Sequence, residues 1–572
     1  MVLPPVRGRA VQALLLVMLT AAPLRAQCLD GTPPDCVRRA GTMAGRSTVY
    51  APHAMIATSQ PLASAAGLQV LQRGGNAIDA AVTAAAVLAV VEPHMTGVGG
   101  DMFAMLWSAR EGHLVALNAS GRSGSLLTRE ELVRRGRRTM PQTGAETITV
   151  PGALSGWAAL LQRYGTISLA DALAPAIRIA EEGFPVTPVI ASEWSDEVRK
   201  LQRDEGARAT FLVDGTRPPR AGEWFRNPDL AASLRLIGRD GASVFYGGEL
   251  GQRIVDRVRS LGGFLTIEDL RDHQPMWVEP ISAPFKGYRV WELPPNNQGV
   301  AVLEMLRMLE PFDLAGMGHN SARYLHTLVE VKKLAYADLA RYVGDPDHLT
   351  APPSALLTDD FIARRRALID TLHAADRVEP GEAQTHSETI YLTAADSAGN
   401  MISFINSQYD LFGSGVVVPG TGFSLQDRGA GFTMTEGLPN TVAARKRPFH
   451  TLIPGFVTRT GANGAEEPWL SFGVMGGSVQ PQGHVQVLLN LLVFGMDLQQ
   501  AVDAGRFRHI AGRRLALEPV IGADVRAALT AMGHDIVRDS AVAFGGAQMI
   551  MRLPRGYAGA SDPRKDGLAV GW

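Results

Sequence analysis

A polar segment, residues 371–388, divides the chain into two parts with different hydrophobic patterns. The segment has no apolar periodicity and ends directly at Thr389, where residues 389–396 have the composition of a β-strand. A Ser-Ala-Gly-Asn turn then leads into a second strand, residues 401–407, which predicts a β-hairpin. Residues 165–380, before the hairpin, predict mostly helices. Strands followed by packed helices indicate a layered α/β fold.

Further elements are expected on both sides of this hairpin. Residues 77–91 predict a fully buried helix, because apolar residues fall on every face. The other expected strands are residues 45–60, 102–107, 415–418, 451–458 and 469–473. One further helix is expected to begin at Pro61, and the others are expected at residues 169–182, 321–342, 482–495 and 498–504.

The composition is that of a globular protein with a large core. The chain has 572 residues, of which 46% are hydrophobic and 19% charged. Its net charge of −1 gives no reason to expect nucleic acid or an anionic membrane as a partner. The glycine-rich turn at residues 96–101 has neither dinucleotide-binding nor Walker spacing, so no cofactor is expected. His53, His94 and His484 have no metal-ligand spacing, so no metal site is expected.

The N-terminus resembles a secretory signal. Arg7 and Arg9 precede an apolar run, residues 10–22, which is too short to cross a bilayer. We expect cleavage after Ala26, so that residues 1–26 are a signal peptide; the alternative is a buried first helix. The two cysteines, Cys28 and Cys36, have the spacing to close one small loop in an oxidising compartment. A periplasmic or secreted protein without stable membrane insertion is expected.

The join at Thr389 suggests one type of chemistry. If the peptide bond before Thr389 breaks, its new α-amine lies within reach of its own hydroxyl and acts as the general base. An unperturbed α-amine has a pKa of about 7.7–8.0, which suits proton abstraction near neutral pH. A threonine at the start of a strand is common, however, so the residues alone leave an ordinary strand as the alternative.

Several motifs, in order along nearly the whole mature chain, resemble those of the γ-glutamyltransferase family. They are residues 61–67, 74–80, 92–101, 150–153, 294–299, 333–338, 412–415, 447–448 and 476–478. The resemblance implies a precursor that cuts itself into two associated subunits, here 27–388 and 389–572. Both subunits would contribute to a four-layer αββα sandwich of the N-terminal-nucleophile hydrolase type.

The resemblance also assigns catalytic residues. The family's nucleophile lies seven residues before the aspartate of the hairpin turn, which gives Thr389 when counted back from Asp396. Self-cleavage would then follow Glu388. The second hydroxyl, which hydrogen-bonds the nucleophile, falls on Ser407. The two glycines that stabilise the oxyanion fall on Gly476 and Gly477.

The residues that bind a γ-glutamyl group match the family less well. The arginine that holds the α-carboxylate is replaced by Ser120, and Arg122, two residues later, is a possible substitute. The paired serines correspond to His450 and Thr451. The aspartate that binds the α-ammonium is replaced by Gly431, and the asparagine two residues after the position of Ser407 is replaced by Tyr409. The sequence resembles the branch of cephalosporin acylases and oxamate amidohydrolases in two segments. These are residues 426–429, which include Arg428, and residues 449–451.

These assignments leave three functions open. The first is cleavage of γ-glutamyl compounds such as glutathione, with water or an amine as the acceptor. The second is hydrolysis of a non-glutamyl dicarboxylic amide, of the glutaryl or oxamate type. The third is a binding protein that has kept the fold without catalysis. The candidate substrate-binding residues are Arg122, Tyr409, Arg428, His450 and Thr451.

Overall fold

The hairpin that begins at Thr389 lies in the middle of a seven-stranded antiparallel sheet, called sheet I. The computed structural model describes residues 45–378 and 388–572. The predicted signal peptide and both cysteines lie outside these residues. In spatial order, sheet I consists of β19 (Leu568–Gly571), β2 (Met55–Thr58), β10 (Glu388–Ala395), β11 (Met401–Tyr409), β3 (Asp101–Ser108), β4 (His113–Ala119) and β7 (Met276–Val278).

A second seven-stranded antiparallel sheet, sheet II, packs against the first. Its spatial order is β1 (Val49–Ala51), β18 (Tyr557–Ser561), β17 (Gly546–Arg552), β13 (Glu466–Met475), β12 (Gly455–Thr460), β9 (Tyr288–Glu292) and β8 (Ile281–Phe285). The apolar layer between the sheets includes Met55, Phe103, Tyr391, Ile405, Phe456, Met475 and Ile550. Successive residues of β10 point to opposite faces of sheet I, so Tyr391 contacts this layer whereas Ile390 and Leu392 face the other way.

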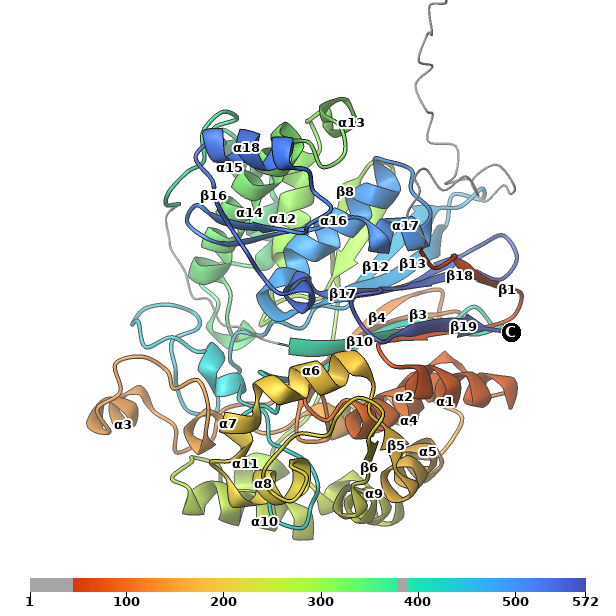
Figure 1. Ribbon diagram of the computed structural model, residues 1–572, viewed down its shortest axis with the longest axis vertical. Coiled ribbons are helices and arrows are strands. Elements are labelled where there is room, and N and C mark those ends of the chain that lie inside the picture. The colour runs from red at the N-terminus through yellow and green to blue at the C-terminus, as the bar shows by residue number, and fades with distance from the viewer. Residues whose placement is uncertain (1–44, 379–387) are drawn as a thin grey trace, which may run out of the picture.

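Helices cover the outer face of each sheet (Figure 1). Against sheet I lie α1 (Pro61–Gln72), α2 (Ala77–Val91) and α4 (Ala153–Tyr164), while α5 (Leu169–Glu182) packs on α2 and α9 (Pro228–Asp240) packs on α5. Against sheet II lie α12 (Gly299–Leu309), α16 (Gln480–Leu492) and α17 (Leu498–Asp503), while α14 (Ala322–Tyr342) packs on α12. The order helices, sheet, sheet, helices confirms the predicted αββα sandwich.

Helix α2 shows why this sequence suits an inner position. A capping box between Asn76 and Asp79 starts it, and all of its residues are buried, as the apolar pattern predicts. Its many alanines allow close packing against α1 and sheet I. Among the described residues, no helix combines the length and apolarity that crossing a membrane requires.

Smaller elements complete the chain. They are α3 (Arg129–Arg134), β5 (Phe184–Pro185), α6 (Pro188–Asp196), α7 (Val198–Leu201), α8 (Glu205–Phe211), β6 (Trp224–Phe225), α10 (Glu249–Ser260), α11 (Ile267–Arg271), α13 (Leu314–Met317), α15 (Asp359–Arg366), β14 (Phe507–Ala511), β15 (Arg514–Leu517), α18 (Ala523–Ala531) and β16 (Asp535–Val537).

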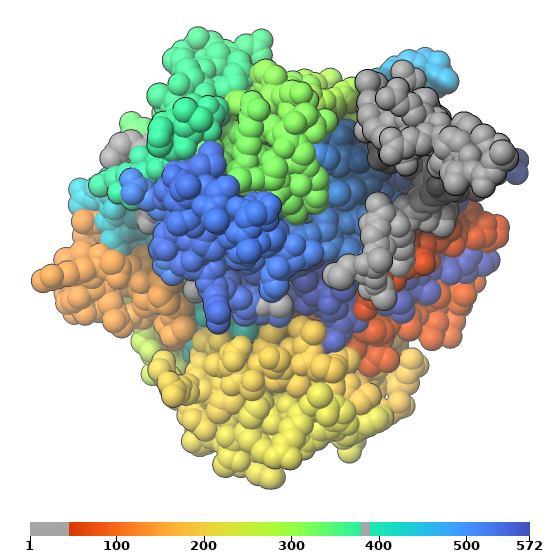
Figure 2. Space-filling model, turned by 45° about the horizontal axis from the view of Figure 1, so that its top comes forward, coloured from red at the N-terminus to blue at the C-terminus, as the bar shows by residue number. Residues whose placement is uncertain are grey.

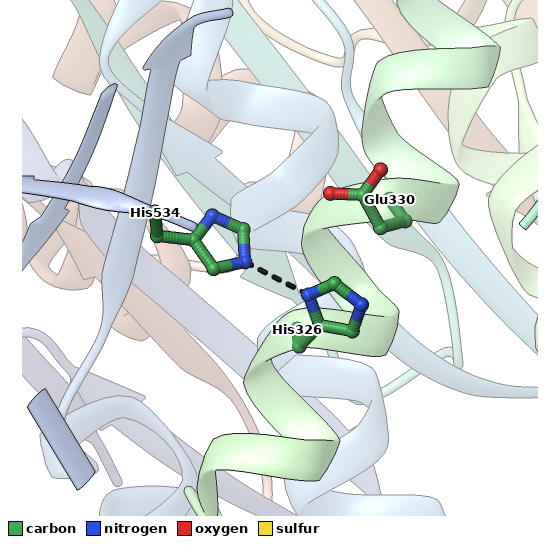
Figure 3. Close-up of side chains that lie close together, drawn as sticks. All are labelled: His326, Glu330 and His534. Atoms are coloured by element: carbon green, nitrogen blue, oxygen red, sulfur yellow. Dashed lines mark hydrogen bonds between the residues drawn. The ribbon is translucent and has the colours of Figure 1, made fainter. Parts of the chain in front are cut away.

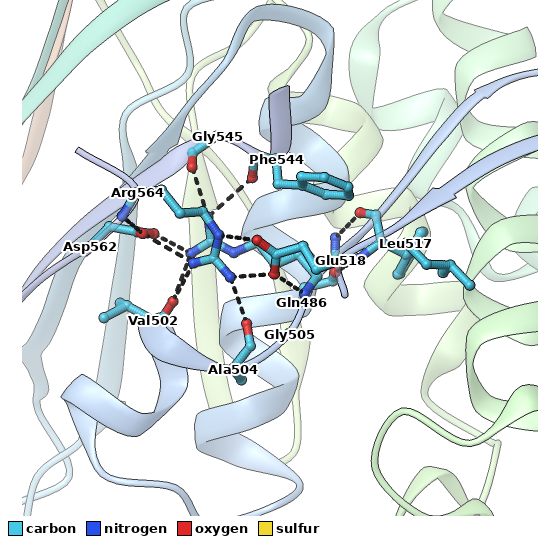
Figure 4. A network of polar contacts seen from close by, with 12 residues as sticks. Gln486, Val502, Ala504, Gly505, Leu517, Glu518, Phe544, Gly545, Asp562 and Arg564 are labelled. Carbon is cyan, nitrogen blue, oxygen red and sulfur yellow. Dashed lines mark hydrogen bonds and ion pairs between the residues drawn. The ribbon is translucent and has the colours of Figure 1, made fainter. Parts of the chain in front are cut away.

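The parts of the chain before and after Thr389 form one body. Each sheet contains strands from both parts. On the face shown in Figure 2, C-terminal residues coloured blue lie between the green and yellow segments of the earlier part. In the later part, Arg506 and Arg564 converge on Asp562 with nitrogen–oxygen distances of 2.6 and 3.0 Å; Figure 4 shows Asp562 and Arg564 within this network. This buried cluster connects the β14–β15 hairpin to the end of β18.

Three strand predictions need correction. The part expected to be mostly helical also contains β7, β8 and β9, which extend both sheets. Residues 415–418 form no strand and make only an isolated bridge between Val417 and Ser424. The strand expected at residues 451–458 begins at Gly455, because the N–H groups of Leu452 and Ile453 bond to side chains and Pro454 has no N–H.

Candidate active site

Thr389 lies near the start of β10, fully buried, beside an irregularity in the sheet. Glu388 is paired with Tyr409, whereas Ile390 is paired with Asn406, so two residues of β11 face the single residue Thr389. Such a β-bulge often occurs beside an active site because it redirects side chains. Because alternate side chains of a strand point to the same face, the side chain of Thr389 points like that of Tyr391, toward the space between the sheets.

Ser407, the predicted second hydroxyl, is one of the two residues opposite Thr389. It is fully buried, and its Oγ accepts a hydrogen bond of 2.8 Å from the N–H of Tyr409. Tyr409 has a φ of +85°, so the backbone turns sharply after the bulge. The structure thus brings Ser407 to the predicted nucleophile.

Gly476 and Gly477 form the turn between the end of β13 and the start of α16. Their φ angles of +120° and +57° are readily adopted only by glycine. Among the described residues, no acceptor is bonded to either N–H group. Both N–H groups lie at the N-terminal side of α16, where the helix dipole favours negative charge. Two such donors are suited to stabilising an oxyanion.

Two glutamines, absent from the predicted site residues, connect these parts. The Nε2 of Gln480 lies 3.5 Å from the Oγ1 of Thr389, while its Oε1 accepts the N–H of Ile453 at 3.1 Å. The Nε2 of Gln298 donates to the carbonyls of Thr451 at 2.7 Å and Gly477 at 2.8 Å. Gln298 lies within the motif at residues 294–299 and Gln480 lies two residues after the motif at 476–478, so both were within reach of sequence reasoning.

Arg428, Tyr409 and Thr451 lie together. The guanidinium of Arg428 is fully buried, lies 4.5 Å from the ring centre of Tyr409, and donates through Nη1 to the Oγ1 of Thr451 at 2.9 Å. Within the described part of the chain, its Nε and Nη2 have no hydrogen-bond partner. Burial lowers the pKa of Arg428 to about 10, with Asp101 opposing the shift, so the side chain stays charged at neutral pH. Two buried, charged donors therefore have no acceptor among the residues that the structure describes.

Asp101 and His450 form a buried pair beside this arginine. Asp101 accepts the N–H groups of Gly121 and Gly152 through Oδ1 and lies 3.3 Å from the Nε2 of His450 through Oδ2. The N–H of Leu452 donates to the Nδ1 of His450, which therefore carries its proton on Nε2. Burial, followed by the charge of Arg428, holds the pKa of His450 well below its usual value. Burial also raises the pKa of Asp101 to about 6, against the opposing charge of Arg428.

Arg122 is placed outside this group. Its Nη1 and Nη2 pair with Asp345 at 3.0 Å and Asp347 at 2.9 Å, and one third of its side chain is exposed. Ser120 is buried and bonds to the side chains of Asn118 and Asn296. The structure therefore does not bring Arg122 to the predicted substrate site, because both ends of its guanidinium are engaged by carboxylates.

A cavity of 580 Å³ reaches the edge of the site. Tyr409, Thr451 and Gln298 line it, and Lys332, Lys333, Arg341 and Arg377 contribute basic groups. Thr389, Arg428 and His450 are not among the described residues that line it. The cavity thus lies next to the reacting groups, and its mainly neutral lining includes four basic side chains.

The three histidines considered for a metal lie apart. His94 pairs with Glu193 at 3.0 Å, His484 pairs with Glu292 at 2.9 Å, and His53 packs against Trp572. A different group, His326, Glu330 and His534, has its potential donor atoms close together. Residue spacing does not reveal this group, since His534 lies far from the other two along the chain.

Comparison with known proteins agrees with this geometry. The family described as Gamma-glutamyltranspeptidase matches residues 63–572. The chain is 37% identical over 528 residues to the glutathione hydrolase-like YwrD proenzyme of Bacillus subtilis (strain 168), covering 90% of this chain and 98% of that protein. It is 35% identical over 536 residues to the oxamate amidohydrolase proenzyme of Klebsiella pneumoniae (strain ATCC 700721 / MGH 78578), covering 91% and 98%.

A solved structure with the same fold, cephalosporin acylase from Bacillus halodurans, superposes with a TM-score of 0.87 at 41% identity and covers 94% of this chain and 98% of its own. The match of nearly the entire chain to the family, together with the αββα sandwich, establishes the assignment. The chain belongs to the γ-glutamyltranspeptidase family of hydrolases and transferases.

Proposed function

We propose that this chain is a periplasmic or secreted proenzyme that cuts itself after Glu388 and then uses the N-terminal Thr389 to hydrolyse an amide. The observation that supports the proposal best is the position of Thr389, buried at the bulge opposite Ser407. The relatives named as proenzymes support it as well. Because both sheets contain strands from each side of Thr389, the fragments would remain associated after the cut.

Self-cleavage begins with attack of the Thr389 hydroxyl on the carbonyl carbon of Glu388. The C–N bond breaks as the C–O bond forms, which converts the amide into an ester and gives Thr389 a free α-amine. Water then hydrolyses the ester and regenerates the hydroxyl. Residues 27–388 and 389–572 are the products when the signal peptide has also been removed.

The mature enzyme uses the same hydroxyl on its substrate. The α-amine of Thr389 accepts the hydroxyl proton as Oγ1 attacks the amide carbonyl. The N–H groups of Gly476 and Gly477 stabilise the resulting oxyanion, and the proton passes to the departing amine. Water, or an acceptor amine, then resolves the ester between Thr389 and the acyl group.

For the acyl group we propose a dicarboxylic half-amide without an α-amine. Among the described residues, two buried donors of Arg428 have no hydrogen-bond partner, and a carboxylate presents two oxygens that match such donors. By the resemblance, the residue that would bind an α-ammonium is replaced by Gly431. A γ-glutamyl substrate is the second candidate, favoured by the family and by the relative named glutathione hydrolase-like.

Gel electrophoresis and N-terminal sequencing test self-cleavage. We expect wild-type protein to give two fragments, the smaller one starting at Thr389, and Thr389→Ala to remain intact. Thr389→Ser is the matched control, because it keeps the hydroxyl and should still cleave. An intact, active wild-type chain would overturn the proposal.

A substrate panel tests the acyl group. Mature enzyme is assayed with glutaryl-p-nitroanilide, γ-glutamyl-p-nitroanilide and oxamate. The proposal expects a higher kcat/KM for the substrates without an α-amine. Preference for the γ-glutamyl substrate would favour the second candidate, and binding without turnover of any of them would favour a catalytically inactive binding protein.

A further inference from the structure

Three buried side chains, His326, Glu330 and His534, lie close together (Figure 3), and none of them is assigned to the active site. His326 and Glu330 lie four residues apart on α14, so they share one face of the helix. His534 approaches them from the turn between α18 and β16. The three potential donor atoms lie within 4.8 Å of one another.

The hydrogen bonds of His326 orient its ring so that the lone pair of Nδ1 points into this cluster. The Nε2 of His326 donates to the carbonyl of Asp370 at 2.9 Å, so its proton is on Nε2 and Nδ1 is a base. Nδ1 lies 2.9 Å from the Nε2 of His534. A backbone carbonyl that orients the second nitrogen of a histidine is typical of metal-binding histidines.

We propose that His326, Glu330 and His534 bind one divalent transition-metal ion of the Zn²⁺ class. Two imidazoles and one carboxylate are a ligand set that Zn²⁺ accepts, with a fourth position for water. Tetrahedral Zn²⁺ places neighbouring nitrogen ligands about 3.3 Å apart. The imidazoles would therefore separate by a few tenths of an ångström, and the ion would replace the proton shared between them.

The remaining contacts are compatible with an ion. When Nε2 of His534 coordinates, its proton moves to Nδ1, which has no partner among the described residues. Glu330 now pairs with Lys333 through Oε1 at 2.7 Å and accepts the N–H of Ala375 through Oε2 at 3.2 Å. If the ion displaces Lys333, that ammonium keeps its bond of 2.6 Å to the carbonyl of Ala375.

The ion would connect the two parts of the chain. His326 and Glu330 precede Thr389, and His534 follows it, so the ion would link the two fragments of the mature protein. This linking role rests on the proposed self-cleavage, whereas metal binding does not.

Titration of EDTA-treated full-length protein with Zn²⁺, followed by calorimetry, tests the site. We expect one Zn²⁺ per chain, a Tm higher than that of the metal-free protein, and a visible absorption band when Co²⁺ is used. Glu330→Gln and His534→Gln should each weaken binding at least about tenfold. His113→Asn, at an exposed histidine, is the matched control and should not change binding.

Absence of stoichiometric binding in wild-type protein, or unchanged binding in both ligand variants, would show that the cluster is only a hydrogen-bonded pair with a nearby carboxylate. The uncleaved Thr389→Ala protein should still bind Zn²⁺. Loss of cleavage and loss of metal binding are therefore distinguishable.

Discussion

Replacement of Arg428 by glutamine is the sharpest test of how the substrate is held. The variant removes a buried charge whose Nε and Nη2 have no hydrogen-bond partner among the described residues. Each hydrogen bond to a charged group contributes about 1.5–3 kcal/mol, so a carboxylate bound by both nitrogens loses about 3–6 kcal/mol. Because about 1.4 kcal/mol corresponds to tenfold, kcat/KM should fall by about 10²–10⁴.

The assay compares two substrates that differ only in the terminal carboxylate. Arg428→Gln should lower kcat/KM by that factor for glutaryl-p-nitroanilide and by much less for pentanoyl-p-nitroanilide. Arg428→Lys should be intermediate for the glutaryl substrate, because lysine keeps the charge but cannot present two parallel donors. An equal loss with both substrates would refute the reasoning, since Arg428 would then act on the structure of the site and not on the carboxylate.

Three other predictions concern the supporting residues. Because burial raises the pKa of Asp101 to about 6, this side chain becomes protonated as the pH falls through that value. If activity requires the carboxylate, kcat/KM of the wild type should fall more steeply below pH 6 than protonation of the Thr389 α-amine alone explains. In Asp101→Asn this additional steepness should be absent from the pH–rate profile. Gln480→Ala removes the side chain that contacts Thr389 and should slow self-cleavage by about fivefold, through loss of roughly 1 kcal/mol of hydrogen bonding, measured as intact chain on gels over time; wild-type speed would contradict this. Asp562→Ala leaves Arg506 and Arg564 without their buried carboxylate and should cost about 3–5 kcal/mol in denaturant unfolding, whereas Asp535→Ala, at an exposed position, should change little.

Much of the local structure was predictable. The sequence correctly indicates the buried helix α2, the helix α5 and the hairpin of β10 and β11. In each case the signal is short-range, because periodicity, capping residues and turn residues all lie within about 20 residues of one another. The short strands β8 and β9 were missed, because two five-residue strands within a helical region carry too little pattern to separate them from loops.

The candidate site was predictable only in part. The resemblance identified Ser407, Gly476 and Gly477, and the structure places Ser407 as one of the two residues that face Thr389 at the bulge. Arg122 was selected because it lies near Ser120 in sequence, but its carboxylate partners Asp345 and Asp347 come from more than 200 residues away. Nothing local to Arg122 signals that pairing.

What the sequence alone determined is which segments are helices and strands around Thr389, and which family motifs they contain. Only the tertiary structure decided that Arg428 is a buried cation with unused donors, and that His534 joins two residues of α14. Local elements follow from short-range sterics and hydrogen bonding. The partners of a buried charge depend instead on how distant segments pack. The hydrogen bonds and opposite charges that offset its desolvation come from whichever segments the fold places beside it.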